Sequence, residues 1–254
     1  MTEARVFELG DFRLESGFTL PNAKLVYKTY GTLAADRSNA VLYPTSYGAQ
    51  HSDIEWLIHP DRILDPSRYF VIVPNMLGNG LSTSPSHLDQ ASYLVTHHDN
   101  VAAQLRLLRQ VFGIEKLALA YGWSMGAQQA YHFAVLHPER VERLAALCGT
   151  ARTRPHNRVF LQSLVAALTA DPAWDGTRFT AVPERGYRAF ARIYASWAAS
   201  QAFYREELYL GLGFRDLDDY LVRGWEASYR RRHPADLLAM LATWLACDVS
   251  NSSR

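Results

Sequence analysis

The chain has 254 residues, and 48% of them are hydrophobic, which is enough for one large α/β domain or for a core with an inserted subdomain. Its 26 basic and 25 acidic residues give a formal net charge of +1, so the composition excludes the strongly basic surface of a protein that binds nucleic acid or an anionic membrane. The two cysteines, Cys148 and Cys247, lack the spacing of a metal site or a disulfide framework, and both are predicted to be buried thiols.

The N-terminal residues contain no apolar signal segment, and no stretch approaches the ~18 uncharged residues that a membrane-spanning helix needs. We therefore expect a cytoplasmic protein that acts on a small molecule. No metal, nucleic-acid partner or membrane contact is predicted.

The first part of the chain predicts four strands. Residues 6–30 alternate loosely between apolar and polar side chains on either side of Pro21-Asn22, which favours two antiparallel strands. Residues 41–43 and 69–73 follow as two further strands, and the second is apolar on both faces, as an interior parallel strand is. The loops after them, residues 44–48 and 74–86, lie where open α/β sheets bind ligands. The second loop is equally well interpreted as a surface turn.

A helix and a strand then lead to the most informative motif of the chain. Asp99 is interpreted as the cap of a helix that ends at Gly113. An apolar run follows, then Gly122-Trp123-Ser124-Met125-Gly126, then a helical face up to Pro138. A strand, a Gly-x-Ser-x-Gly turn and a helix in this order are typical of the nucleophile elbow of α/β-hydrolases, in which the turn projects the serine hydroxyl above the sheet. The pentapeptide alone also fits an ordinary turn in which Ser124 caps a helix, but its flanks favour the elbow.

An elbow of this kind predicts an oxyanion hole made of two backbone N–H groups. The residue after the nucleophile, Met125, is expected to supply one of them. Ser46 or Tyr47, in the loop after the third strand, is expected to supply the other. A plain polar turn explains that loop equally well, so the assignment depends on the elbow.

After a sixth strand at residues 144–148 the pattern becomes helical. Amphipathic helices are predicted around residues 160–168, 187–204, 217–225 and 237–244. We therefore predict an α/β core over residues 1–150, with a mostly parallel sheet flanked by helices, and a helical lid over residues 151–247. Arg188 and Arg192 share one helix face, where they are surface residues unless one turns inward to bind a carboxylate. The run of three arginines at residues 230–232 is interpreted as a solvated helix end.

Five segments, in the right order, carry a resemblance to a known family: residues 27–31 (YKTYG), 74–85, 99–104 (DNVAAQ), 122–126 (GWSMG) and 186–192 (GYRAFAR). They resemble the homoserine O-acetyltransferase family of α/β-hydrolase-fold enzymes, in a divergent branch that includes hydrolases. The resemblance implies a serine acyl-enzyme that takes an acetyl or succinyl group from a coenzyme A thioester and passes it to the hydroxyl group of an amino acid. It implies Ser124 as the nucleophile, Arg192 as a lid residue that meets the carboxylate of the acceptor, and a homodimer formed through the lid. No cofactor is implied, and acyl-CoA enters as a co-substrate.

Three features depart from the family pattern. Residues 44–48 lack the usual His-Ala-Leu-Thr-Gly sequence, and Trp123 and Ala127 stand where glycines are typical. A bulky Trp123 beside the nucleophile is expected to contact the substrate and to narrow its pocket. Both the acyl donor and the acceptor are therefore open, and ester hydrolysis is weighed beside acetyl transfer, which ranks first.

The partners of the serine are the largest departure. Serine catalysis on this fold uses a carboxylate and then a histidine, both after the serine in the chain. Only residues 248–254 follow the predicted lid. None of the histidines after Ser124 follows a strand that carries the acidic residue, as that order requires; these histidines are His132, His137, His156 and His233. The expectation is that the last core strands and the triad partners are absent from this chain, as in a truncated product or one part of a longer enzyme.

An alternative from another class is an inactive fragment or pseudoenzyme that only binds a ligand or a partner chain. Loss of the acid and the histidine supports it, because a serine without its base is a poor nucleophile. A dehydrogenase-like nucleotide binder is excluded, because no G-x-G-x-x-G motif follows the first parallel strand.

Overall fold

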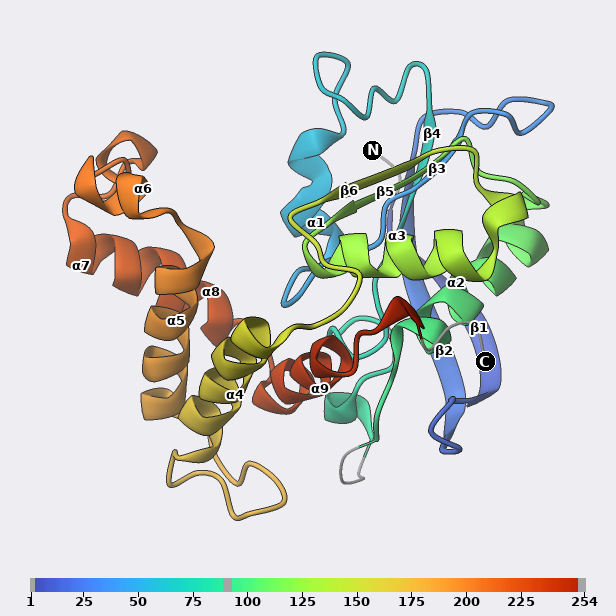
Figure 1. The fold of residues 1–254 in the computed structure, drawn as a ribbon. Coiled ribbons are helices and arrows are strands. Elements are labelled where there is room, and N and C mark those ends of the chain that lie inside the picture. The colour runs from blue at the N-terminus through green and yellow to red at the C-terminus, as the bar shows by residue number, and fades with distance from the viewer. Residues whose placement is uncertain (1–2, 89–92, 251–254) are drawn as a thin grey trace.

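One mixed sheet organises the structure. A computed structural model of the chain describes residues 3–88 and 93–250, and its strands form a six-stranded sheet in the order β1-β2-β4-β3-β5-β6 (Figure 1). Strands β1, β2 and β4 pair in antiparallel fashion, whereas β4, β3, β5 and β6 are parallel. The strands are β1 (Arg5–Arg13), β2 (Thr19–Tyr30), β3 (Ala40–Leu42), β4 (Phe70–Pro74), β5 (Leu119–Trp123) and β6 (Leu144–Leu147). The predicted mostly parallel sheet is therefore present.

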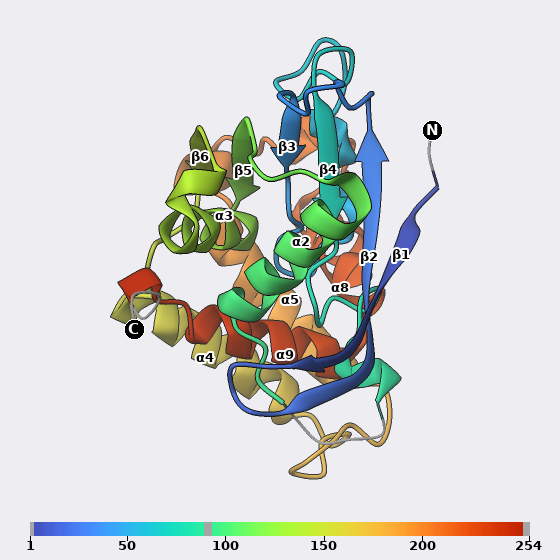
Figure 2. The ribbon, with the colours of Figure 1, turned by 90° about the vertical axis from the view of Figure 1, so that its right-hand side faces the viewer.

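Both faces of the central strands are covered. Side chains alternate along a strand, so Leu42 of β3 joins the apolar cluster on the side of α2 (His97–Phe112), while Val41 joins the cluster that holds Ile54 of α1 (His51–Ile54). Figure 2 shows α2 and α3 (Met125–Leu136) side by side on one face of the strands. This packing fixes the carboxyl ends of β3 and β5, from which the candidate site is built.

The chain after β6 is helical. The helices from α4 (Pro155–Thr169) to α8 (Ala227–Arg230) are gathered to the left of the sheet in Figure 1. Helix α9 (Pro234–Leu245) packs against both α4 and η2 (Pro85–His87). Among the described residues of this part, the β-type pairs are two isolated bridges, Arg152 with Asp248 and Trp174 with Phe179. The division of the chain into a core and a lid at residue 150 stays a prediction.

The remaining elements have the following bounds: η1 (Glu55–Leu57), η3 (Pro138–Arg140), α5 (Glu184–Ala198), α6 (Gln201–Arg205), η4 (Leu210–Leu212), α7 (Leu217–Asp219) and η5 (Tyr220–Glu226). Element η5 is a π-helix, and the other η elements are single 3₁₀ turns.

The predicted break at Pro21-Asn22 is wrong. Strand β2 runs through both residues, and the chain turns earlier, where Leu14 N donates to Phe18 O at 2.8 Å. Asn22 adopts a φ of 46°, and the β1–β2 ladder shifts register between Gly10 and Phe12, opposite this point. A proline is tolerated at such a bulge because the ladder does not need its missing N–H.

Two helix boundaries also differ from the prediction. Helix α2 is capped by Thr96, whose hydroxyl accepts from Asp99 N at 3.3 Å, while the Asp99 carboxylate accepts from Thr96 N at 2.7 Å. Asp99 is therefore the third residue of a capping box and not the cap. The single helix predicted over residues 187–204 is two helices, because Ser200 caps α6 by accepting from Phe203 N at 3.1 Å.

Candidate functional site

Ser124 lies on a sharp turn between β5 and α3. Its φ of 52° and ψ of −120° are unusual for a residue other than glycine. The neighbouring glycines allow the turn: a Cβ at Gly122 would collide with the backbone of Ala127, and a Cβ at Gly126 would lie 2.7 Å from Pro44 O. The sequence places Ser124 at a strand-to-helix turn, and the structure has that geometry.

The predicted oxyanion donors Met125 and Ser46 lie together. Met125 N, the first N–H of α3, donates to Ser46 Oγ at 3.2 Å. The loop that carries Ser46 is held on the sheet, because Thr45 N donates to Pro74 O at 3.2 Å and Met76 N donates to Thr45 Oγ1 at 2.9 Å. The Ser46 hydroxyl thus lies at the N-terminus of α3, where the N–H groups and the helix dipole favour a negative charge.

A cavity of about 730 Å³ opens beside Ser124. It is lined from the sheet side by Ser46, Trp123 and Gln128, and from the helical part by aromatic side chains of α5, η5, α8 and α9: Tyr194, Trp197, Trp225, Tyr229 and Trp244. Asp53 is the one charged residue among its described lining residues. The cavity therefore suits an apolar ligand with few charges.

Tyr47 and Trp123 contribute to the cavity in different ways. The Tyr47 side chain is 6% exposed, its ring stacks on Tyr194 at a centroid distance of 5.7 Å, and its hydroxyl donates to Leu237 O at 3.2 Å. Burial raises the pKa of Tyr47 well above its usual value. Trp123, in contrast, is 42% exposed and lies directly beside Ser124. Its position agrees with the predicted contact between this ring and a substrate, which stays a prediction.

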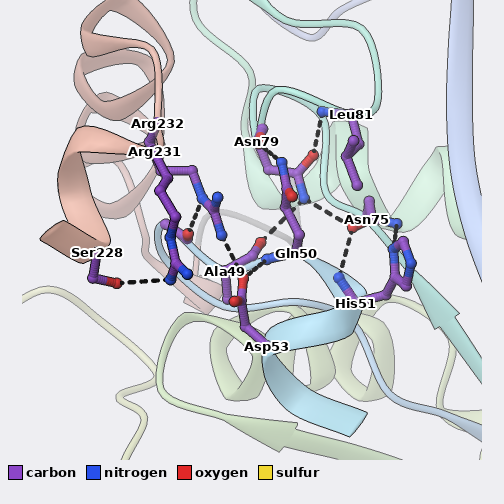
Figure 3. Close-up of polar contacts among 11 residues, drawn as sticks. Ala49, Gln50, His51, Asp53, Asn75, Asn79, Leu81, Ser228, Arg231 and Arg232 are labelled. Carbon is purple, nitrogen blue, oxygen red and sulfur yellow. Dashed lines mark hydrogen bonds and ion pairs between the residues drawn. The ribbon is translucent and has the colours of Figure 1, made fainter. Parts of the chain in front are cut away.

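A polar network ties the helical part to the loop after β3 (Figure 3). Arg232 Nε donates to Gly48 O at 2.7 Å, and its guanidinium pairs with Asp53 of α1. The Asn79 amide donates to Ala49 O and to Asn75 Oδ1, each at 3.1 Å. The side chain of Arg232 is only 10% exposed, so the interpretation of the arginine run as a fully solvated helix end is wrong for this residue. The Asp53 carboxylate and the Gly48 carbonyl oxygen are both acceptors, so the guanidinium of Arg232 makes a charge-assisted hydrogen bond to each.

Arg192 is not among the residues that line the cavity. It lies on α5 and forms an ion pair with Glu226, whose side chain is 6% exposed. Arg188 Nε lies 3.9 Å from the same carboxylate. A buried carboxylate needs a nearby positive charge, so these arginines face a partner within the protein.

The histidines after Ser124 do not line its cavity within the part of the chain that the structure describes. His132 is buried on α3 with Nδ1 2.8 Å from Gln128 O, and burial lowers its pKa. His233 caps α9, and the His156 ring packs against Trp197 at 4.8 Å. Among the described residues that line the cavity, none is a histidine.

Sequence reasoning missed several polar residues of the cavity, among them Gln128 and Cys148. Gln128 lies one helical turn after Ser124, and its amide donates to Thr150 Oγ1 at 3.1 Å. The i to i+4 spacing on α3 is the signal that could have identified it. Cys148 is exposed and lines the same cavity, so the prediction of a buried thiol is wrong for it, while Cys247 is buried as predicted. Cys148 follows the last residue of β6 with a φ of 52°, which turns its side chain out of the core.

Within residues 3–88 and 93–250 no helix is both long and apolar enough to cross a membrane. The same residues contain no group of three or more His, Cys, Asp or Glu side chains arranged to hold a metal ion.

Comparison with known proteins identifies the family. Residues 44–193 match the model of the alpha/beta hydrolase fold family. Ethyl acetate hydrolase from Pseudomonas veronii is 37% identical over 253 residues, which cover 96% of this chain and 72% of that protein. The crystal structure of an acetylester hydrolase from Corynebacterium glutamicum superposes with a TM-score of 0.94 at 35% identity, over 99% of this chain and 74% of the other.

Homoserine O-acetyltransferases are more distant relatives. The enzyme from Thermobifida fusca is 36% identical over 184 residues, which cover 64% of this chain and 48% of that protein. The resemblance predicted from the motifs is thus confirmed at the level of the fold, while the esterases match more of the chain. This chain is an enzyme of the esterase and acyltransferase kind, and it belongs to the α/β-hydrolase fold family.

Proposed function

We propose that this chain hydrolyses small uncharged esters through an acyl intermediate on Ser124. The observation that carries the proposal is the position of Ser124 on a strained turn, beside Met125 N and Ser46 Oγ, at the wall of an aromatic cavity. The relatives named as hydrolases of ethyl acetate and of acetyl esters support the same reaction class.

The bonds formed and broken in this reaction can be assigned to Ser124 and its two neighbours, Met125 and Ser46. Ser124 Oγ bonds to the carbonyl carbon of the ester, and the carbonyl oxygen takes the negative charge, which the N–H of Met125 stabilises. The Ser46 hydroxyl accepts from Met125 N in the free enzyme, and its own hydrogen can be donated to the oxyanion. The bond to the alcohol then breaks, and the alcohol leaves with the proton of the serine. Water finally displaces Ser124 and releases the carboxylic acid.

The charges around the cavity favour hydrolysis over transfer to an amino acid. Asp53, the one charged residue of the described lining, is already paired with Arg232. Arg192 is paired with Glu226 and does not line the cavity. Neither Arg192 nor Arg232 is therefore available to bind the carboxylate of an amino-acid acceptor. For this reason we rank ester hydrolysis ahead of acetyl transfer, which reverses the order predicted from the sequence.

A second candidate is binding without turnover. It is favoured by the absence of histidine from the described residues that line the cavity, since a serine hydroxyl without a base is a weak nucleophile. Acyl transfer from acyl-CoA to a small hydroxyl acceptor is a third outcome, because the more distant relatives include homoserine O-acetyltransferases.

A burst experiment separates these candidates. With p-nitrophenyl acetate, the chain should release one nitrophenolate per molecule in a rapid first phase, and Ser124→Ala should abolish that phase. Ser196→Ala is the control, because this serine is exposed on α5, where its hydroxyl donates to Ile193 O at 2.8 Å. A burst that survives in Ser124→Ala would contradict the proposal. Ester binding without any burst would favour the second candidate, and faster release with an added alcohol acceptor would favour transfer.

A further inference from the structure

The helical wall of the cavity contains an unusual element. Residues Tyr220–Glu226 form the π-helix η5, and Trp225 at its end lines the cavity beside Ser124. Long π-helices are rare and are often found at functional sites, because the wider turn changes the direction of the side chains that follow. Here the π-helix places the Trp225 ring in the wall of the cavity.

Trp225 belongs to a group of rings that reaches the loop after β3. Its ring lies 5.7 Å from that of Tyr194 and 6.2 Å from that of Tyr229. Both tyrosines in turn contact the Tyr47 ring, at 5.7 and 6.5 Å. Because Tyr47 follows Ser46 in the chain, the wall that contains Trp225 is packed directly onto the loop of the candidate oxyanion site.

Both ends of η5 are anchored by charge. At its start, Asp219 accepts from Arg223 Nε at 2.6 Å, and Arg223 holds the pKa of that carboxyl far below its usual range. At its end, Glu226 is buried and pairs with Arg192 of α5. Trp225 is the residue directly before Glu226, so the pair with Arg192 fixes the backbone that carries the ring.

We infer that Trp225 determines how long an uncharged ligand the Ser124 cavity accepts, and that the Arg192–Glu226 pair is the positioning device that keeps its ring in the wall. The inference rests on the proposed function for the identity of the ligand as a small ester, but not for the binding itself. The Trp225 ring packs against Tyr194 and Tyr229, so moving it aside for a longer alkyl chain would break these contacts, whereas Trp123 is 42% exposed.

The test measures binding, which does not require turnover. Calorimetry with a homologous series of straight-chain methyl ketones, which resemble esters but cannot be hydrolysed, gives the ratio of affinities for long and short ligands. Trp225→Ala should raise this ratio by about tenfold or more, because each methylene admitted to an apolar pocket changes affinity by about that factor. Trp225→Phe keeps an aromatic ring, should fold in any case, and should raise the ratio less.

Matched controls separate this effect from general loosening. Trp174→Ala removes a half-buried tryptophan from outside the cavity and should leave the ratio unchanged. The double variant Arg192→Gln with Glu226→Gln removes the pair without leaving a lone buried charge, and it should raise the ratio in the same direction as Trp225→Ala. Arg205→Gln with Glu206→Gln removes an exposed pair of the same kind and should have no effect.

The outcomes are distinct from those of the burst experiment. An unchanged ratio in both folded Trp225 variants would overturn the inference, even if the burst on Ser124 occurs. A raised ratio in a protein that shows no burst would retain the inference and remove the proposed hydrolysis. A raised ratio in Trp225→Ala with none in the Arg192 and Glu226 double variant would overturn the positioning role of the pair.

Discussion

Gly126 shows how a single missing Cβ shapes the candidate site. Its backbone lies against Pro44 O, at the start of the loop that also carries Ser46. The same loop brings Ser46 Oγ within 3.2 Å of Met125 N. Helix α3 can therefore lie this close to the loop only because residue 126 has no Cβ.

We predict that Gly126→Ala separates these two segments. The added methyl group would lie 2.7 Å from Pro44 O, which is backbone and cannot rotate away. Overpacking of this kind costs about 1–3 kcal/mol of stability. Urea unfolding should show that loss, and the rate of acylation by p-nitrophenyl acetate should fall with it.

Gly211→Ala is the matched control for this substitution. Nothing lies within 4 Å of a Cβ at Gly211, and its φ is not positive, so the free energy of unfolding should change little. Equal stability of the Gly126 variant and the wild-type chain would contradict the packing argument.

Among the elements, the junction between α8 and α1 is held by Arg232. Its guanidinium bonds at once to the Gly48 carbonyl oxygen and to the Asp53 carboxylate (Figure 3). The planar fork of arginine can reach both acceptors, whereas the single ammonium of lysine cannot match that geometry. The contact joins the helical part of the chain to the loop after β3.

Arg232→Lys should therefore weaken the junction although the charge is kept. Loss of one hydrogen bond to a charged group costs about 1.5–3 kcal/mol, and the free energy of unfolding in urea should fall by about that amount. Arg231→Lys is the neighbouring control, since Arg231 is exposed and bonds only to Ser228 Oγ, at 3.3 Å, in Figure 3. A variant at position 232 as stable as the control would show that the fork geometry contributes nothing.

The elements also show what the sequence could predict. The buried strands β3, β4 and β5 were predictable because continuous apolar runs mark strands covered on both faces. The turn at residues 14–18 and the π-helix η5 were not. In the turn Glu15 N donates to Asp99 Oδ1, far along the chain, and at the end of η5 Glu226 pairs with Arg192 of α5. A period of 3.6 predicts a helix over residues 217–225, but it does not distinguish an α-helix from the π-helix that Tyr220–Glu226 form.

In the whole molecule, a buried histidine links stability to pH. His97 is the first residue of α2, and its Nε2 lies 3.1 Å from Oε1 of Gln128 on α3. Burial and the nearby His132 lower its pKa from 6.5 to about 3. The unfolded chain therefore binds a proton at this residue at a higher pH than the folded chain does.

The sign of the effect follows from that difference. Above pH 6.5 neither state is protonated at His97, and between pH 6.5 and about 3 only the unfolded state is. Stability should fall on acidification through this window, by about 1.4 kcal/mol per pH unit from this residue. Urea unfolding at a series of pH values should show a shallower slope for His97→Gln. The exposed His59→Gln should keep the wild-type slope, and identical slopes for both variants would contradict the assignment.

Some contacts of the candidate site could be predicted from the sequence and others could not. Ser124 and Met125 are adjacent in the chain, and the elbow motif also predicts which loop meets them, so their meeting with Ser46 could be predicted. The pairing of Arg192 with Glu226 and the entry of Trp225 into the cavity could not be, because they depend on how helices distant in sequence pack.

The central claim is that an acyl group forms on Ser124, and mapping that group tests it most directly. The chain is mixed with p-nitrophenyl acetate, quenched in acid during the first phase, digested, and analysed by mass spectrometry for the acetylated peptide. The account predicts one acetyl group, on the peptide that contains Ser124, and none on that peptide in Ser124→Ala. Acetylation confined to lysine or to Cys148, with the Ser124 peptide unmodified, would contradict it.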